Sequence, residues 1–424
     1  MSKTKVALLG TGFIANIHAE SYARFVHDAE VVAVYGRDKA HAEAFAAAHG
    51  YPVALKRTDG GGAHGIPAAY GDIDELLAAE QVDVVDICLP NYLHHEACLK
   101  AAGANKHVII EKPLALTLEQ ADEMIEACRS RGLKLMYAEE LCFAPKYERV
   151  RALVEAGAVG DVYMLKQAEK HSGPHSRWFY QKETAGGGVM MDMGCHALAW
   201  FRWMNKNNPV KSVYADMKTV LHKETTDCDD NTVTLVEFEN GVTCIAEDSW
   251  AKHGGMDDRI EVYGTKGMME TERFGDGITV YIEEKLCKGE KTTYMPEKFV
   301  DAELAKSSGV GGHNGSDFYA THFFIEKILG RPNGKYSIDV YQAVDMGICG
   351  ILAFRSILNG NTPVDIPNLR NPEERDAWRG DNACTDPDIA GDQLLPVTSY
   401  PVAEIPDETY DRVRQLWLAG KDAE

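Results

Sequence analysis

The sequence predicts an α/β protein with an N-terminal doubly wound parallel sheet and a C-terminal α+β domain whose large, mostly antiparallel sheet is open. Three observations carry this prediction. Short β-branched runs alternate with helical patterns over roughly the first 140 residues, and a glycine-rich turn follows the first run. Runs of period two then follow one another beyond residue 145. Alternation with helices is typical of parallel βαβ units, whereas consecutive strands with short turns indicate an antiparallel sheet.

The N-terminal domain is expected over residues 1–140 and has the pattern of a Rossmann unit. Its predicted strands are 6–9, 31–35, 82–89, 107–110 and 133–137, and its predicted helices are 13–26, 38–49, 93–103 and 117–131. Each strand is a short apolar run, as expected for a strand that is buried on both faces. The glycine-rich stretch 60–65 interrupts the alternation and predicts a surface loop.

The second domain is expected over residues 141–362, followed by a C-terminal extension over 363–424. Predicted strands are 162–170, 210–221, 231–239, 242–250 and 258–264, and predicted helices are 146–156, 315–329 and 338–359. Asn240-Gly241 between two strand runs is a hairpin signal. The extension has weak periodicity apart from a helix near 408–418, and we expect it to embrace either a partner subunit or the other domain.

Composition narrows the function classes. Lys and Arg total 44 and Asp and Glu total 65, so the formal net charge is 44 − 65 = −21, which opposes nucleic-acid binding. No run approaches the roughly 18 apolar residues of a membrane span, and the N-terminus has no secretory pattern. The ten cysteines form no CxxC pair. We therefore expect a cytoplasmic protein with no nucleic-acid partner, no membrane association and no bound metal.

The first turn, Gly10-Thr11-Gly12-Phe13-Ile14-Ala15, matches the G-x-G-x-x-G/A pattern between a strand and a helix. The first glycine permits the tight turn, the second lets a pyrophosphate approach the backbone, and Ala15 permits close helix–strand packing. The helix N-terminus offers free N–H groups and the positive end of its dipole. We predict a dinucleotide site with contacts from Gly10, Gly12, Phe13 and Ile14.

The second strand ends in Tyr35-Gly36-Arg37-Asp38, without the carboxylate that would bind a ribose 2′-hydroxyl. Gly36 and Arg37 are predicted cofactor contacts. Arg37 could stack on adenine or meet a 2′-phosphate, or be a solvated surface cation. Asp38 is expected to cap the next helix. The choice between NAD and NADP stays open.

Further candidates follow the later strands. Leu89, Pro90, Asn91 and His94 lie after a buried strand, at the edge of the sheet where ligands bind in open α/β folds. Asn91 could touch the nicotinamide ribose or simply cap a helix. Glu111-Lys112-Pro113 follows the next strand, so Lys112 could hydrogen-bond a substrate hydroxyl, or form a surface ion pair with Glu111.

A second element carries acid–base groups. Gly186-Gly187-Gly188 predicts a flexible loop leading into a helix that contains Asp192 and His196. These two residues are four apart, so we expect both on one helical face, with the carboxylate orienting the imidazole. A plain surface ion pair is the alternative.

The order of these motifs resembles that of the Gfo/Idh/MocA oxidoreductases over roughly residues 4–360. The resemblance implies that Lys112 is the catalytic lysine, His196 the acid–base histidine and Asp192 its supporting carboxylate, with Glu111 near the nicotinamide ribose. It implies hydride transfer between NAD(P)(H) and a carbinol carbon, with His196 or Lys112 taking the hydroxyl proton. It also implies a homodimer or homotetramer. Cys142 stands where relatives often carry an arginine, so one family substrate contact is expected to be missing.

Substrate contacts are expected from His175, Trp178 and His313, and Trp178 could stack on a sugar face or an aromatic aglycone. The segment 311–317 that contains His313 is either a polar substrate loop or the capped start of a helix. The segments that contain these residues resemble those of the family branch that acts on sugars, polyols or glycosides, with oxidation at C3 of a glucosyl unit. The alternative is an NAD-bound enzyme that uses transient oxidation for glycoside cleavage or epimerisation, without net redox.

Overall fold

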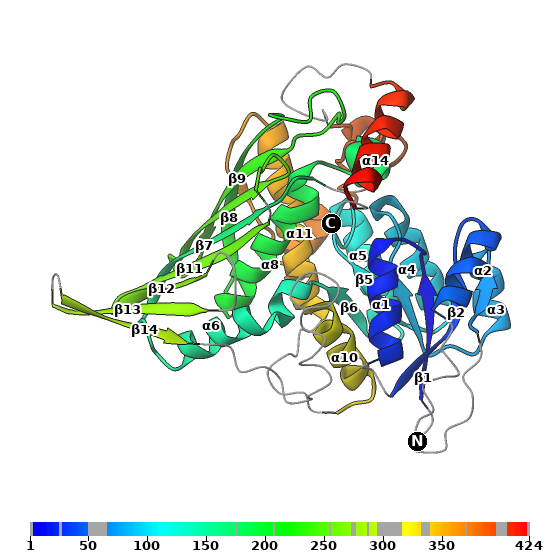
Figure 1. Cartoon of the computed structure of the whole chain (residues 1–424), viewed down its shortest axis with the longest axis horizontal. Coiled ribbons are helices and arrows are strands. Elements are labelled where there is room, and N and C mark those ends of the chain that lie inside the picture. The colour runs from blue at the N-terminus through cyan, green and yellow to red at the C-terminus, as the bar shows by residue number, and fades with distance from the viewer. Residues whose placement is uncertain are drawn as a thin grey trace.

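The computed structural model describes most of the chain, and two sheets lie side by side in it (Figure 1). The described residues are 3–24, 28–49, 66–173, 176–206, 208–254, 256–272, 277–285, 288–294, 316–331, 340–369, 371–395 and 405–421. The predicted fold class is confirmed. The predicted loop 60–65 lies outside the described residues.

The first sheet is fully parallel, with strand order β3-β2-β1-β4-β5-β6. Its strands are β1 (Thr4–Leu9), β2 (Ala29–Tyr35), β3 (Ala68–Tyr70), β4 (Val84–Ile87), β5 (His107–Glu111) and β6 (Leu135–Ala138). The helices between them are α1 (Phe13–Arg24), α2 (Lys39–Ala48), α3 (Ile73–Ala79), α4 (His94–Gly103) and α5 (Leu118–Arg129), with the 3-10 turn η1 (Asn91–Leu93) before α4. Strand β3 and helix α3 were not predicted from the sequence, and they are only three and seven residues long.

The second sheet has the order β14-β13-β12-β11-β7-β10-β9-β8-β15, and only the β7–β10 pair is parallel among its described pairings. Its strands are β7 (Val162–Lys170), β8 (Val210–Lys218), β9 (Asn231–Phe238), β10 (Thr243–Ser249), β11 (Asp257–Gly264), β12 (Gly267–Thr271), β13 (Ile278–Lys285), β14 (Lys288–Tyr294) and β15 (Val364–Asp365). The predicted hairpin is confirmed, since Gly241 has φ +83° in the turn between β9 and β10.

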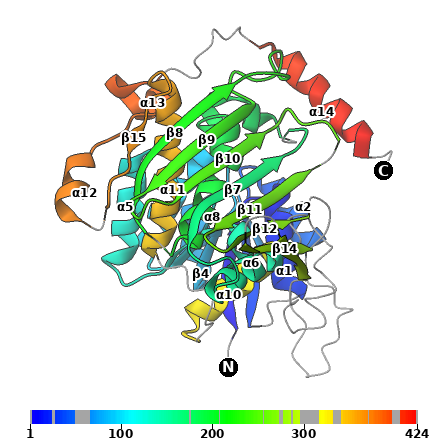
Figure 2. The ribbon, with the colours of Figure 1, turned by 90° about the vertical axis from the view of Figure 1, so that its left-hand side faces the viewer.

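Helices cover one face of this second sheet. They include α6 (Pro145–Glu155), α8 (Cys195–Met204) and α11 (Val340–Leu358), while α10 (Ser316–Ile328) packs on α1. Figure 2 looks onto the opposite face, and no described helix crosses in front of the central strands β8, β9, β10 and β7. Strand β9 shows why one face of the sheet is left uncovered by helices. Buried and more exposed residues alternate strictly along it, so only one of its faces carries the core side chains.

Short helical segments lie between the longer elements. They are η2 (Glu140–Phe143), η3 (Arg177–Tyr180), α7 (Lys182–Ala185) and the π-helical turn η4 (Met190–Gly194), which runs directly into α8. Segment η2 follows the last strand of the first sheet, and the others lie between β7 and α8. Among the described helices, none is both long and apolar enough to cross a membrane.

The C-terminal extension holds both halves of the same chain. Its segments are α12 (Pro372–Trp378), α13 (Pro387–Ala390), η7 (Gly391–Gln393) and α14 (Asp407–Lys421), and α12 and α13 lie at the edge of the molecule in Figure 2. Arg375 of α12 pairs with Asp122 and Glu126 of α5, and Asp381 pairs with Arg355 of α11. The expectation that the extension embraces the other domain is thus confirmed.

Replacing Arg355 with alanine is expected to lower the free energy of unfolding by about 2–4 kcal/mol, because it leaves the Asp381 carboxylate without its largely buried cation. Arg355 donates to both Asp381 oxygens at 2.6 and 2.5 Å and also to the Ala383 carbonyl at 3.2 Å. Calorimetric melting of the purified variant checks this. Arg379→Ala is the matched control, since Arg379 and its partner Asp376 are both exposed, and an equal effect of the two variants would contradict the prediction.

Candidate active site

The glycine turn after β1 is shaped to admit a dinucleotide. Gly10 has φ +126°, and a Cβ there would stand 2.3 Å from the Cys88 carbonyl oxygen, so only glycine fits. At Gly12 a Cβ would meet nothing within 4 Å, so the space in front of this backbone is open to a pyrophosphate. Ala15 is fully buried where α1 packs on the sheet. These observations fit the predicted cofactor.

The adenosine side of the site follows β2. The Asp38 carboxylate accepts the N–H of Ala40 at 2.9 Å and that of His41 at 3.4 Å, so its expected capping role is confirmed. Arg37 is exposed beside it. Gly36 faces the glycine turn, since a Cβ there would lie 3.1 Å from Thr11 Cγ2. Gly36 and Arg37 stay predicted cofactor contacts.

The loop after β4 is fixed by side chains that follow it. The Asn91 amide donates to the Ala185 carbonyl at 2.8 Å, so the helix-capping alternative for Asn91 is wrong, and the residue joins the two halves instead. His94 is fully buried, with Nδ1 2.8 Å from the Pro113 carbonyl and Nε2 2.8 Å from the Leu89 carbonyl. Burial lowers the pKa of His94.

The side chains of Glu111 and Lys112, at the end of β5, point in different directions. Glu111 turns inward, where its Oε1 lies 3.2 Å from His18 Nε2 and its Oε2 accepts the Lys112 N–H at 3.2 Å. Lys112 crosses to the other half, where its Nζ lies 3.0 Å from Asp192 Oδ1 and donates to the Asp192 carbonyl at 3.2 Å. The alternative of a surface Glu111–Lys112 ion pair is therefore wrong.

The Lys112–Asp192 ion pair is the charged centre of the site. Its side chains are 18% and 10% exposed, and the second Asp192 oxygen accepts the Trp250 indole N–H at 3.0 Å. Burial lowers the pKa of Lys112, but Asp192 and neighbouring anionic groups outweigh burial, and the net pKa lies well above the ordinary value. Burial raises the pKa of Asp192, but Lys112 and His171 outweigh it and lower the pKa overall. The pair is ionised at neutral pH.

His196 does not pair with Asp192, which corrects the expectation drawn from their spacing. Its Nδ1 lies 2.7 Å from Glu139 Oε1 and its Nε2 lies 3.5 Å from Glu140 Oε1. The π-helical turn that contains Asp192 breaks the 3.6-residue repeat on which that expectation rests. Burial lowers the pKa of His196, but the opposite effect of the Glu139 and Glu140 charges is larger. The net pKa of His196 therefore lies well above its ordinary value.

The loop Gly186–Gly188 is buried, and its glycines serve close packing rather than the freedom expected from the sequence. A Cβ at Gly188 would stand 2.1 Å from the Asp229 carbonyl oxygen, and one at Gly186 would stand 2.2 Å from a Leu116 methyl carbon. This packing sets η4 against the second sheet.

Of the three predicted substrate contacts, only Trp178 lies among the residues that the structure describes. His175 and His313 lie outside the described residues. Trp178 is half-buried and stacks on Phe179 with ring centroids 3.7 Å apart. Next to it, the Arg177 guanidinium lies 4.8 Å from the Tyr410 ring centre, so α14 packs on this segment. Cys142, the departure from the family pattern, is 1% exposed and lies in the hydrophobic core.

Sequence reasoning did not identify three neighbours of the catalytic groups. Glu139 and Glu140 directly follow β6, so the rule that drew attention to Lys112 after β5 could have found them. Trp250 follows β10 and carried no comparable signal.

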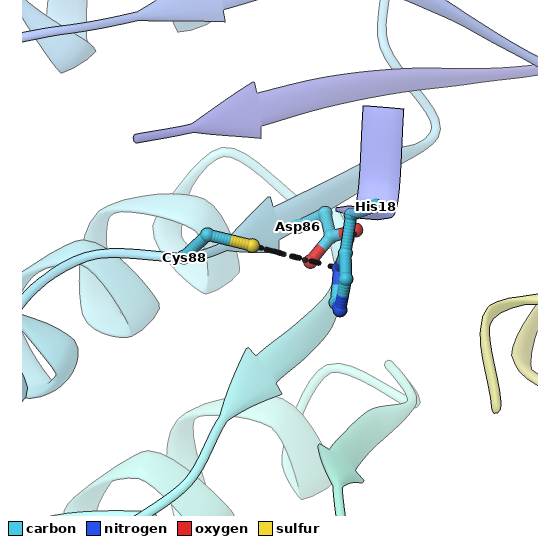
Figure 3. A group of neighbouring side chains, drawn as sticks. All are labelled: His18, Asp86 and Cys88. Atoms are coloured by element: carbon cyan, nitrogen blue, oxygen red, sulfur yellow. Dashed lines mark hydrogen bonds and ion pairs between the residues drawn. The ribbon is translucent and has the colours of Figure 1, made fainter. Parts of the chain in front are cut away.

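Within the part of the chain that the structure describes, two groups of buried side chains have potential metal-ligand atoms within 4.8 Å of one another. In the first, Nδ1 of His18 is 2.9 Å from Asp86 Oδ2 (Figure 3). In the second, which contains Glu139, Cys195 and His196, Nδ1 of His196 is 2.7 Å from Glu139, and the Cys195 thiol donates to the Asp192 carbonyl. Hydrogen bonds within the protein already engage these atoms, and we assign no metal to either group.

Three stretches of the chain match known families. Residues 4–139 match the oxidoreductase family with an NAD-binding Rossmann fold, residues 147–270 the Gfo/Idh/MocA C-terminal domain, and residues 216–374 the C-terminal domain of glycosyl hydrolase 109. The D-glucoside 3-dehydrogenase of Escherichia coli K12 is 32% identical over 265 residues, which are 59% of this chain and 71% of that protein. The chain belongs to the Gfo/Idh/MocA oxidoreductase family.

Other proteins similar to this Gfo/Idh/MocA chain are also named as dehydrogenases or were solved with NAD or NADH. The myo-inositol 2-dehydrogenase of Thermotoga maritima is 28% identical over 57% of this chain and 72% of its own length. GenD2 from gentamicin A biosynthesis, solved with NAD, has TM-score 0.69 and 25% identity over 87% of this chain and 97% of its own. Levoglucosan dehydrogenase, solved with NADH and levoglucosan, shares the fold with TM-score 0.72 at 22% identity, over 87% of this chain and 100% of its own. The predicted NAD(P)-dependent dehydrogenase class is confirmed.

Glu139→Gln is expected to lower the melting temperature by several degrees at pH 6 and by less at pH 9. The folded-state pKa of His196 lies above its unfolded value, so its pairing with Glu139 stabilises fully below about pH 6.5 and is lost as pH rises through the folded pKa. Thermal melts across this range check the prediction. Glu237→Gln, which removes an exposed partner of Lys211, is the control. A deficit for Glu139→Gln that is equal at both pH values would rule out the charged His196.

Proposed function

We propose that this protein is an NAD(P)-dependent dehydrogenase of sugars, polyols or glycosides, with C3 of a glucosyl unit as the favoured position. The observation that carries the proposal is the partly exposed Lys112–Asp192 pair, which lies at the carboxyl edge of the nucleotide-binding sheet. The related E. coli protein is named a D-glucoside 3-dehydrogenase, and the related Thermotoga protein a myo-inositol 2-dehydrogenase. These names support an alcohol carbon of a carbohydrate as the reacting centre.

Lys112 is the group that exchanges a proton with the substrate oxygen in this proposal. Its ammonium group is more exposed than His196, whose side chain is 2% exposed and directed at two carboxylates. Asp192 holds the ammonium in place through Oδ1, while Trp250 holds Oδ2, so the proton-transferring nitrogen has a fixed position. The carboxylate that orients His196 is Glu139, and not Asp192 as the sequence suggested.

The cofactor would be held at the turn of Gly10 and Gly12, the N-terminus of α1, and the loops after β2, β4 and β5. When bound, NAD(P) supplies a nicotinamide ring that accepts or returns the hydride of the substrate carbon. The protein must then move only the hydroxyl proton. In alcohol oxidation Lys112 accepts the hydroxyl proton, so its amine must be unprotonated. In ketone reduction Lys112 donates a proton, so it must start as the ammonium ion.

We expect the rate of alcohol oxidation to rise with pH from 7 to 10, and the rate of ketone reduction to fall over the same interval. The raised pKa of Lys112 keeps it protonated near neutrality, so base catalysis needs alkaline pH and acid catalysis does not. Lys112→Met should lower kcat/KM by about 10²–10⁴ and remove the pH dependence, and Lys112→Arg should do the same because arginine stays protonated. Steady-state rates at each pH check this. Near-normal rates for Lys112→Met would remove Lys112 from the reaction.

The first experiment is a substrate screen of the purified protein. Nicotinamide reduction is recorded with NAD and with NADP against monosaccharides, polyols, and aryl O- and C-glycosides, and product analysis locates the new carbonyl. Reduced cofactor with one class of carbohydrate, and a 3-keto product, supports the proposal. A response only to non-carbohydrate alcohols would overturn the substrate class, and a carbonyl at another carbon would overturn the C3 assignment.

A second candidate is cleavage or epimerisation of a glycoside with no net redox. Two observations favour it. Residues 216–374 match the C-terminal domain of glycosyl hydrolase 109. The site also has a second acid–base unit, His196 with Glu139 and Glu140, whereas simple alcohol oxidation needs only one. Release of aglycone from an aryl glycoside without accumulation of reduced cofactor would favour this candidate over the first.

We also propose that a second copy of the chain covers the outer face of the large sheet, giving a homodimer or homotetramer. Tyr163, Val233 and Leu235 lie on its strands and are 52%, 41% and 40% exposed, which supports an apolar contact there. Light scattering of the purified protein tests the assembly. Leu235→Glu should dissociate it, and a monomeric wild type would overturn the proposal.

A further inference from the structure

A buried group of charged side chains lies beneath the Glu111-Lys112 turn, inside the nucleotide-binding half. His18 of α1 is 1% exposed, and its two ring nitrogens face carboxylates from neighbouring strands. Nδ1 is 2.9 Å from Asp86 Oδ2 on β4, and Nε2 is 3.2 Å from Glu111 Oε1 on β5. Nδ1 hydrogen-bonds to Asp86, and a protonated ring forms an ion pair with Glu111 at Nε2, so the two carboxylates favour the imidazolium form of His18.

The surroundings of Asp86 complete the group. The Tyr22 hydroxyl donates to Asp86 Oδ2 at 2.8 Å, and Cys88 Sγ lies 3.7 Å from Asp86 Oδ1 and 3.5 Å from His18 Nδ1. Figure 3 shows His18 reaching from α1 to the carboxylate of Asp86, with Cys88 on the same strand end. Burial lowers the pKa of His18, but Asp86 and Cys88 more than offset it, and the net pKa lies well above the ordinary value.

The second carboxylate connects this group to the catalytic lysine. Glu111 is the last residue of β5, and its Oε2 accepts the backbone N–H of Lys112 at 3.2 Å. On the far side of the turn, the Pro113 carbonyl is held by His94 Nδ1 at 2.8 Å. The backbone from which Lys112 leaves the sheet is therefore fixed on one side through Glu111 and His18, and on the other through His94.

We propose that His18 is a positioning residue of the hydride-transfer site, which holds Glu111 so that Lys112 enters the site against Asp192; the inference rests on the proposed role of Lys112. A stability role alone does not account for the group, because a buried ionic triad is often no more stabilising than apolar side chains of the same volume. His18 also compensates the charge of Glu111, which is a neighbour of the Lys112 ammonium.

The test compares His18→Gln with His95→Gln. His95 also pairs with a glutamate, Glu123, at 2.6 Å, but on the surface of α4, so it controls for loss of a histidine–glutamate pair. For His18→Gln we expect kcat to fall at least 30-fold while KM for the alcohol and Kd for the cofactor change less than threefold. His95→Gln should match the wild type. Wild-type kcat in His18→Gln would overturn the proposal, and so would a loss confined to KM.

The pH profile gives a readout that a structural role would not move. Without His18, Lys112 moves away from Asp192, which is the first of the charges that raise its pKa, so the midpoint of the alkaline rise in oxidation should move down by at least 0.5 pH unit. Asp86→Asn removes the competing carboxylate and should move the midpoint down. The groups that face His18 are Asp86 on β4, Cys88 directly after β4, Glu111 on β5 and Tyr22 on α1. Midpoints that stay fixed in both variants would contradict the proposal.

A crystal structure of His18→Gln keeps this inference separate from the proposed function. If no alcohol in the screen reduces the cofactor with the wild type, the proposed function fails, yet the distance from Lys112 Nζ to Asp192 Oδ1 is still measurable. We expect it to lengthen beyond 4 Å from its present 3.0 Å. An unchanged distance would overturn the positioning role. Should His18→Gln fail to fold, Asp86→Asn, which keeps the side-chain volume, carries the pH measurement, and an unmoved midpoint in it would overturn the proposal.

Discussion

The ion pair between Lys112 and Asp192 is the interaction on which the candidate site depends. Its members come from opposite halves of the chain, Lys112 from the end of β5 and Asp192 from the π-helical turn before α8. The site therefore exists only when the parallel sheet and the antiparallel sheet are packed together. Two other features hold the halves in this arrangement. The buried glycines 186–188 let η4 pack against the second sheet, and the Asn91 amide joins the loop after β4 to Ala185, just before these glycines.

The same pair shows how a few charges are kept inside an acidic protein. A buried ion is costly unless a partner of opposite sign lies within hydrogen-bonding distance. Lys112 is compensated by Asp192, His196 by Glu139, and His18 by Asp86 and Glu111. The carboxylates that compensate His196 and His18 lie on strands of the parallel sheet or directly after them, and Lys112 itself follows β5. The carboxyl edge of the sheet thus supplies the charge balance as well as the cofactor crevice.

Much of the fold was predictable from the sequence because its signals are local. The turn from Gly10 to Ala15, the Asp38 cap and the Asn240-Gly241 hairpin each depend on the conformation of a few adjacent residues. Strand β3 is too short to give a pattern. Strands β12 to β14 were not predicted either, and β14 reads Lys-Gly-Glu-Lys-Thr-Thr-Tyr, which lacks the apolar alternation that marks a half-buried strand.

The candidate site was predictable as a set of residues but not as a set of pairs. Spacing along a regular helix placed His196 with Asp192, yet the π-helical turn changes that spacing and Glu139, 57 positions away, takes the place beside the imidazole. Long-range partners of this kind leave no trace in a local pattern. For the same reason His18, which reads as an ordinary residue of the first helix, gave no sign of its contact with Glu111.

The C-terminal extension has a consequence for how molecules enter and leave the crevice. Arg375 is bonded to α5 of the nucleotide-binding half, while Asp381, a few residues further on, is bonded to Arg355 of the other half. A rigid opening of the two halves at this edge would have to break one of these two connections or extend the segment between them. We therefore expect exchange of cofactor and product to proceed by local movement of surface segments, with the two halves remaining clasped throughout the catalytic cycle.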